Sequence, residues 1–288
     1  MKPRVVAVPD LWRAKGLVLA LLAVAVGTVR VAAQSVQYRS PEGVEYRSRP
    51  DTGAIARAEA ALARDPRNVN LVIALGIAQS GAQQFREAIE TFTRGLAIAP
   101  NHPMLYRWRG HRYLSVREFD KAAADLTHAL TLDPANYGAL FHLGIIRYLR
   151  GDFPAAAELF RRAQPVAPDA GELAGSTDWR WMSLARSGRM AEARSMLAQR
   201  PDSLPVDPNY VYARRLAFYR GSVKPANLLR EGDDPTVEAT LAYGLGNWHL
   251  VRADTASARA MFQRSVASGG WAAFGFILSE VELTRLRQ

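Results

Sequence analysis

The chain has 288 residues, 49% of them hydrophobic, which is enough for a packed core and excludes a globally disordered chain. Its formal charge is +10 at pH 7, but the basic residues are spread along the chain, unlike the clustered Lys and Arg of a nucleic-acid-binding surface. It contains no cysteine, so disulfides, thiolate nucleophiles, zinc–sulfur sites and a cysteine-linked lipid are excluded.

Residues 1–33 have the order of a secretory signal peptide. A basic start is followed by the apolar run LVLALLAVAVG at 17–27 and by the small residues VAA at 31–33. We expect cleavage after Ala33, which would give a periplasmic or secreted protein with a formal charge of +6. The alternative is a membrane anchor formed by residues 17–33, although its apolar run is shorter than the roughly 20 residues that span a bilayer.

Residues 34–52 do not share the pattern of the rest of the chain. QYRSPEGVEYRS repeats Tyr-Arg-Ser around Pro41-Glu42-Gly43, a composition typical of a turn. The segment is therefore either an extended lead or a small β-hairpin. We favour the extended lead, because an isolated hairpin is only marginally stable in water.

Four prolines lie 34 residues apart, at Pro66, Pro100, Pro134 and Pro168. Each follows an apolar run with helical character, and proline disfavours the helical conformation in the residue before it. A fixed spacing of this kind indicates a repeated supersecondary unit.

Further positions inside the unit keep the same period. They are glycines, phenylalanines, alanines and large apolar residues: Gly76, Gly110 and Gly144; Phe85, Phe119 and Phe153; Ala88, Ala122 and Ala156; Phe92, Leu126 and Phe160. Glycine within a helix costs about 0.5–1 kcal/mol relative to alanine, so we expect another helix backbone to approach closely at each glycine. The alanines are small for the same reason. The unit is thus a helix, a tight turn, a second helix and a stop.

This unit resembles the tetratricopeptide repeat (TPR), in which an aromatic residue, Leu-Gly, Tyr, Ala, an aromatic residue and Pro follow in order. YRWRGHRY (106–113) has the aromatic residue and the tyrosine at the expected distances from its glycine, but it carries Arg109 where leucine is usual. LFHLGIIR (140–147) keeps Leu-Gly and has Arg147 at the tyrosine position. The resemblance implies an all-α fold, an α-solenoid of antiparallel helix pairs, with three regular units over 69–170.

The remaining segments are assigned around these units. Residues 53–67 are expected to form an N-terminal capping helix, and 171–272 to form three degenerate TPR-like units, the middle one irregular. The segment 273–288 is expected to be a C-terminal capping helix, with Phe274 and Ile277 on its apolar face and Glu280 and Glu282 on a polar back.

The sequence offers no catalytic or metal-binding motif. The five histidines form no HExxH pair, and no G-x-S-x-G elbow or dinucleotide-binding loop is present. His111 and His142 fall on the first helices of adjacent units and could meet, but two histidines without a third ligand do not make a zinc site. Asp233 and Asp234 precede Pro235 and are expected to cap a helix. We therefore expect neither an enzyme, nor a cofactor, nor a metal.

The resemblance also implies where a partner would bind, because the first helix of each TPR unit lines the concave face. Carried over by position, the candidate groove residues are Ile73, Ile77, Arg107, His111, Phe141, Ile145 and Tyr148. One subgroup of the family clamps a C-terminal carboxylate with Lys, Asn and Arg. The matching positions here hold Ile73, Ile77, Trp108, Gly138 and His142, so that clamp is missing.

The expected function is an exported scaffold that binds a protein or peptide of unknown identity through a largely apolar groove in the cell envelope. The groove can instead be filled by the chain's own later helices, by residues 34–52, or by a second copy in a homo-oligomer. The alternative function is recognition of cell-wall peptidoglycan as an accessory module of an envelope complex. No nucleic acid is expected as a partner, and membrane contact is expected only if the leader stays uncleaved.

Overall fold

The computed structural model describes residues 34–199, 207 and 210–287, so the expected leader at 1–33 lies outside the described residues. The elements that it contains are, in chain order, β1 (Val36–Arg39), β2 (Glu45–Arg47), α1 (Ala54–Arg64), α2 (Val69–Gly81), α3 (Phe85–Ile98), α4 (Pro103–Ser115), α5 (Phe119–Leu132), α6 (Tyr137–Leu149), α7 (Phe153–Ala163), η1 (Gln164–Val166), α8 (Ala170–Arg186), α9 (Met190–Ala198), α10 (Val211–Arg220), η2 (Pro225–Asn227), α11 (Pro235–Leu250), α12 (Thr255–Ala267) and α13 (Phe274–Arg285).

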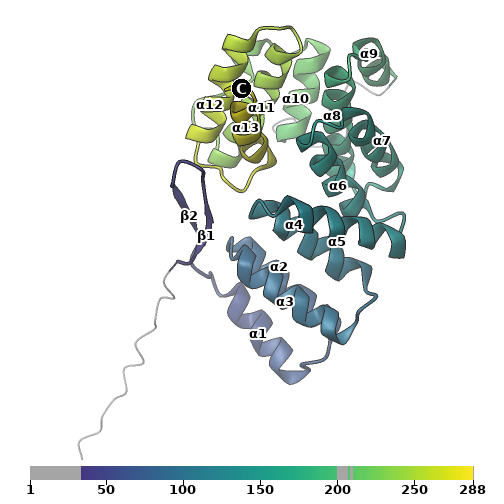
Figure 1. Ribbon diagram of the computed structural model, residues 1–288, viewed down its shortest axis with the longest axis vertical. Helices are drawn as coiled ribbons and strands as arrows, with labels where there is room; N and C mark the ends of the chain where they lie inside the picture. Colours follow the sequence, from purple (N-terminus) through teal and green to yellow (C-terminus); the bar gives the residue numbers. More distant parts are fainter. Residues whose placement is uncertain (1–33, 200–206, 208–209, 288) are drawn as a thin grey trace, which may run out of the picture. The chain divides into compact units, whose positions relative to one another are not determined.

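Helices α2–α7 form three antiparallel pairs that stack in succession, as the 34-residue period predicts (Figure 1). A residue with a left-handed backbone connects the two helices of each pair, and it also recurs every 34 residues, at Gln83, Arg117 and Gly151. These φ angles are +55°, +65° and +83°. The described residues are therefore those of an all-α solenoid with a small β-hairpin before it.

The repeated glycines leave room for a side chain of the second helix. A Cβ built on Gly76 would lie 2.3 Å from the ring of Phe92, and one built on Gly144 would lie 2.8 Å from the ring of Phe160. We expected a helix backbone at these positions, whereas the nearest atoms belong to the large residue found 16 positions later. The alanines Ala88, Ala122 and Ala156 are fully buried.

The prolines follow the ends of the second helices. Helices α1, α3 and α5 each end two residues before a proline, namely before Pro66, Pro100 and Pro134. The fourth interval differs, because α7 ends at Ala163 and the 3₁₀ turn η1 lies between it and Pro168.

Residues 34–48 form a hairpin, so the preference for an extended lead is wrong. Strands β1 and β2 are antiparallel, with Tyr38 opposite Tyr46. The hairpin is stable because it is not isolated. Gln37 is fully buried, and its side chain donates to Glu87 (2.8 Å) and accepts from the backbone N–H of Arg86 (2.8 Å) on α3.

The later units are less regular than the first three. Helices α8 and α9 form one pair, joined at Gly188 with φ +75°, and α11 and α12 form another, in which Gly246 faces Phe262. Between them, the irregular unit consists of the single helix α10 and the 3₁₀ turn η2 rather than a helix pair. The expected three units over 171–272 are thus two pairs and one partial unit.

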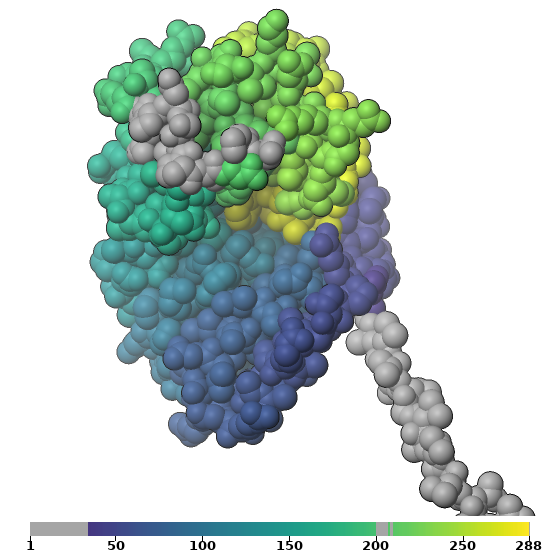
Figure 2. Space-filling view, turned by 180° about the vertical axis from the view of Figure 1, so that it is seen from behind, coloured from purple at the N-terminus to yellow at the C-terminus, as the bar shows by residue number. Residues whose placement is uncertain are grey.

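Helix α13 does not present a polar back to solvent, contrary to expectation. It packs against α11 and α12 and also touches α6. Glu282 is 2% exposed and pairs with Arg186 of α8 (2.9 Å). Glu280 pairs with Arg117 in the turn between α4 and α5 (2.9 Å). Figure 2 shows the yellow C-terminal residues between the blue repeats and the green helices. The C-terminal helix is therefore an internal part of the array.

Candidate functional site

Two of the expected groove residues are core residues. The side chain of Ile145 is fully buried in the main hydrophobic cluster, which also contains Ile277 and Leu278 of α13. Tyr148 is fully buried as well, and its hydroxyl donates to Oδ1 of Asn247 on α11 (2.8 Å). These two assignments to a partner surface are wrong, because the C-terminal helices cover this part of α6.

Two other candidates lie at the opposite end of the array, on α2. Ile77 is 41% exposed and Ile73 is half-buried. Neither side chain lines the cavity described next. The first repeat therefore contributes exposed apolar surface but no enclosed site.

The other three candidates meet in one cavity of about 440 Å³. Arg107 and His111 come from α4 and Phe141 from α6. The remaining walls are formed by α8, α10, α11 and the segment 272–274. A cavity of several hundred Å³ is in the usual range for a ligand-binding site. The C-terminal part of the chain therefore completes this half of the groove instead of filling it.

Arg107 is the dominant charged group of the cavity. Its guanidinium lies 3.7 Å from the centre of the Trp108 ring, a cation–π contact. No carboxylate of the described residues lies within ion-pair distance of it, and its Nη1 atom has no hydrogen-bond partner among them. Burial lowers the pKa of Arg107 to about 10, while Glu172 opposes the shift, so the side chain remains a cation at neutral pH.

Two neutral imidazoles lie beside this cation. The rings of His111 and His142 are stacked with their centres 3.8 Å apart. Burial lowers the pKa of both far below the ordinary histidine value, and the positive charges of Arg112 near His111 and Arg107 near His142 add to the effect. The expected approach of the two histidines is found. The described residues contain no group of three side chains placed to hold a metal ion.

The wall opposite α4 is aromatic, and the sequence did not reveal it. Tyr137 begins α6, and its hydroxyl donates to the backbone carbonyl of Glu172 (2.7 Å). Tyr210 and Tyr212 contact each other edge to face at 5.7 Å. They belong to the irregular unit, where no repeat position assigns a residue to the concave face. The one available pattern was Tyr-x-Tyr itself, which is too common to indicate a site.

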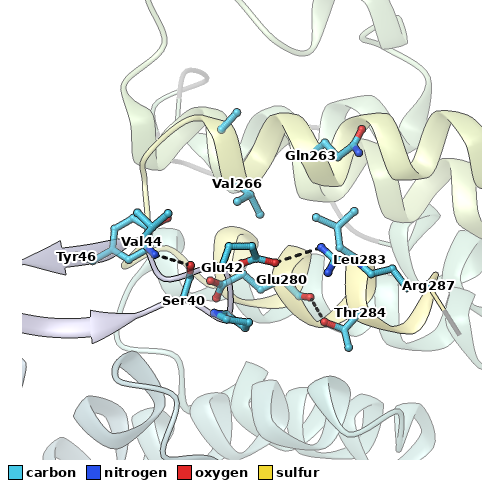
Figure 3. Close-up of a pocket in the computed structure, with 12 residues that line it drawn as sticks. Ser40, Glu42, Val44, Tyr46, Gln263, Val266, Glu280, Leu283, Thr284 and Arg287 are labelled. Carbon is cyan, nitrogen blue, oxygen red and sulfur yellow. Dashed lines mark hydrogen bonds and ion pairs between the residues drawn. The ribbon is translucent and has the colours of Figure 1, made fainter.

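A second cavity, of about 300 Å³, lies between the hairpin turn, α12 and α13 (Figure 3). Figure 3 shows Glu42 and Arg287 pointing toward one another across it, 3.2 Å apart. Glu280, which also lines it, is held by Arg117 and by the Tyr38 hydroxyl (3.0 Å). Its charged groups all have partners within the described chain, so the cavity that contains Arg107 is the stronger candidate.

Asp233 and Asp234, which precede α11, have different roles. Asp234 caps the helix, because its Oδ1 atom accepts from the backbone N–H of Thr236 (2.8 Å). Asp233 instead pairs with Arg214 of α10 (2.7 Å).

No helix in the described part of the chain is both long and apolar enough to cross a membrane.

Comparison with known proteins identifies the repeats. Two models of the tetratricopeptide repeat match the chain, over residues 52–107 and 108–171. Residues 52–171 are therefore tetratricopeptide repeats. The solved structure of a tetratricopeptide repeat protein from Parabacteroides merdae has the same fold, with 19% identity, a TM-score of 0.50, and coverage of 82% of this chain and 91% of that one.

Two curated relatives each match less than a third of the chain. A heat-shock protein cognate co-chaperone of Aspergillus fumigatus, sgt12, is 30% identical over 87 residues, which are 30% of this chain and 26% of that protein. The small glutamine-rich tetratricopeptide repeat-containing protein 2 of Saccharomyces cerevisiae is 24% identical over 87 residues, 30% of this chain and 25% of that protein. The chain thus spans about a quarter of the length of each.

Proposed function

We propose that the protein is an interaction scaffold that binds a segment of a partner protein in the 440 Å³ cavity of its concave side. The observation that carries this proposal is the cavity itself, where aromatic side chains from α4, α6, α10 and α13 surround a few polar groups. An apolar pocket with a small number of oriented polar groups is the usual form of a binding site. The tetratricopeptide repeats, and the co-chaperone among the relatives, support a binding role rather than catalysis.

The proposal includes export to the cell envelope. Its support is the order of basic, apolar and small residues in 1–33, which is that of a signal peptide. The mass of the mature protein tests it, since cleavage after Ala33 removes those residues. A mature chain that still begins at Met1 would favour the anchor at 17–33 instead.

Peptide selection tests the binding role. Random peptides displayed on phage are selected on the purified protein, and the best are measured against a variant with a filled cavity, Thr236→Trp. Thr236 lies at the exposed start of α11 and lines the cavity, so a tryptophan there narrows the site without disturbing the core. We expect affinity to fall at least about tenfold, because the lost contacts of one buried residue exceed 1.4 kcal/mol.

The matched control is Thr131→Trp, at an exposed position near the end of α5 and outside the cavity. This variant should bind the selected peptides as well as the wild type does, and both variants should keep the wild-type melting temperature. Peptides that bind Thr236→Trp undiminished would place the binding surface elsewhere and overturn the proposal.

Cell-wall recognition, the alternative function, would use the scattered arginines and the aromatic residues of the groove, and several of these arginines have structural partners. Arg109 forms a bidentate pair with Asp125 (2.7 and 2.8 Å), Arg186 pairs with Glu282, and Arg214 pairs with Asp233. These guanidinium groups stabilise contacts between helices and are not free for a polymer. Peptide binding is therefore the better-supported function.

A further inference from the structure

The cation of Arg107 forms no ion pair in the described part of the chain, although protein surrounds most of its side chain and Glu172 acts on it only from a distance. A buried charge without a partner is costly, and proteins normally pair such groups. Its Nη1 atom is shielded and makes no hydrogen bond there. The group is therefore able to accept an anionic partner.

The position of the guanidinium is fixed by two helices. It stacks on Trp108 of its own helix, and its Nε and Cζ atoms lie against Gly138 of α6, where a Cβ would be 2.0 Å from Nε. Any larger residue at position 138 would displace the arginine. The guanidinium is thus held between Trp108 and α6 while it lines the cavity. Because its orientation is set before binding, little conformational entropy remains to be lost.

The surroundings favour an anion over a cation. His111 and His142 stay neutral, and Arg112, a second buried arginine on α4, lies over the ring of Phe85 rather than against a carboxylate. Glu172 is the one carboxylate among the described residues that line the cavity, and it is beyond ion-pair distance of Arg107. The α4 side of the cavity is therefore positive, whereas the opposite side is aromatic.

We propose that Arg107 binds a carboxylate of the partner segment, and that Phe141, Tyr210 and Tyr212 contact the apolar group next to that carboxylate. This inference rests on the proposed function and specifies its ligand chemistry. A planar guanidinium matches a carboxylate through two parallel N–H···O bonds. The carboxylate can be an Asp or Glu side chain or a free C-terminus, because both present the same group. The anchor differs from the family's C-terminal clamp, whose positions here hold other residue types.

The first experiment uses a probe that does not depend on peptides. Titration calorimetry compares 3-phenylpropionate with its neutral amide, 3-phenylpropionamide, on the wild type, on Arg107→Met and on Arg147→Met. Arg147 is the control, since it is 43% exposed on α6 and pairs loosely with Asp152 (3.8 Å). We expect the wild type and Arg147→Met to bind the carboxylate at least about tenfold more tightly than the amide.

Arg107→Met should remove that preference while the circular dichroism spectrum stays that of the wild type, because methionine keeps an apolar contact with Trp108 but has no charge. An Arg107→Met protein that still prefers the carboxylate would overturn the inference. Equal binding of the carboxylate and the amide to the wild type would also overturn it.

The second experiment separates this inference from the proposed function. The tightest selected peptide is made in three forms: unchanged, with Asp and Glu replaced by Asn and Gln, and with an amidated C-terminus. Weakening of the second form by about tenfold or more identifies a side-chain carboxylate, and weakening of the third identifies the C-terminus. If neither form weakens but Thr236→Trp still blocks binding, the scaffold function stands and the carboxylate anchor fails. If no peptide depends on the cavity but the fragment preference is found, the anchor stands and the peptide function fails.

Discussion

Two imidazole rings stacked inside the array, His111 and His142, make its stability depend on pH. Burial keeps the pKa of both well below the ordinary value of about 6.5, so they stay neutral in the folded protein. The unfolded chain binds protons at these positions below pH 6.5, whereas the folded chain does not. The free energy of unfolding must therefore fall as the pH falls through 6.5.

The expected loss is about 1.4 kcal/mol per pH unit for each histidine below pH 6.5. Urea denaturation at pH 7.5, 6.5 and 5.5 measures it, and His142→Gln should have a shallower dependence than the wild type. Parallel pH profiles for the wild type and His142→Gln would contradict the prediction.

Ile145 should be among the residues least tolerant of a charge. Its side chain is fully buried between the repeats and the C-terminal helix, so Ile145→Asp places a carboxylate in the core. We expect a loss of more than about 4 kcal/mol, which would unfold a protein of ordinary stability. Circular dichroism and thermal melting measure it. Ile77→Asp, at a 41% exposed site, should remain folded, and a folded Ile145→Asp protein would mean that α13 does not cover α6.

Arg109 shows what a departure from a repeat pattern can mean. Leucine is usual at this position, and the arginine forms a bidentate pair with Asp125 on the second helix of the same unit. Asp125 is itself buried. Because Arg109 and Asp125 pair with each other, each charged residue considered alone in the sequence is unexpected at a contact between helices. Pattern matching identified the departure, but only the packing of α4 on α5 explains it.

At the scale of elements, the hairpin depends on aromatic contacts with the C-terminal segment. The ring of Tyr46 stacks on Trp271 at 5.7 Å and meets the edge of Phe276 at 5.5 Å. Tyr38 stacks on Tyr46 at 5.8 Å and lies under the guanidinium of Arg117 at 4.0 Å. The hairpin is thus stabilised from outside itself, which its own sequence cannot indicate.

Tyr46→Ala should detach the hairpin while the repeats remain folded. Loss of the aromatic contacts is expected to cost about 2 kcal/mol, since each aromatic pair contributes roughly 0.5–1.5 kcal/mol beyond its buried area. Hydrogen exchange of the amides in β1 and β2 should accelerate, and exchange in α4–α7 should not. Val44→Ala, at a 50% exposed position in the same hairpin, should leave exchange unchanged. Slow exchange of the β1 and β2 amides in Tyr46→Ala would show that the hydrogen bonds of Gln37 to α3 are enough to hold the hairpin in place.

The elements that sequence analysis placed well are those whose partners lie at a fixed distance along the chain. Helices α2–α7 repeat their contacts every 34 residues, so their turns, their small residues and their ends, except that of α7, could be predicted. The hairpin, α10 and α13 have partners far away, such as Tyr38 and Glu280, which are 242 residues apart. Contacts of this kind leave no periodic pattern in the sequence. The cavity that contains Arg107 depends on α10 and on the start of α13, and for that reason only its α4 and α6 side could be predicted.

At the scale of the whole array, contacts between early and late elements replace a strictly linear stack. In an ordinary solenoid each unit touches only its neighbours, and stability is a sum of local terms. Here Arg117 of the second repeat bonds Glu280 of α13 (2.9 Å) and the backbone carbonyl of Trp271 (3.0 Å). Tyr148 bonds Asn247 across 99 residues. Loss of the C-terminal helices would therefore expose the interior of the first three repeats.

The hairpin also has a mechanical consequence. Because it lies against α13 through the Tyr38–Glu280 bond, the first and last described elements of the array are fastened side by side. A stretching force applied near residues 34 and 287 would act first on the contact between the hairpin and α13. The stacked helix pairs would carry no load until that contact broke. An open solenoid would instead peel from its two ends. This protein should resist extension up to a single threshold and then lengthen abruptly.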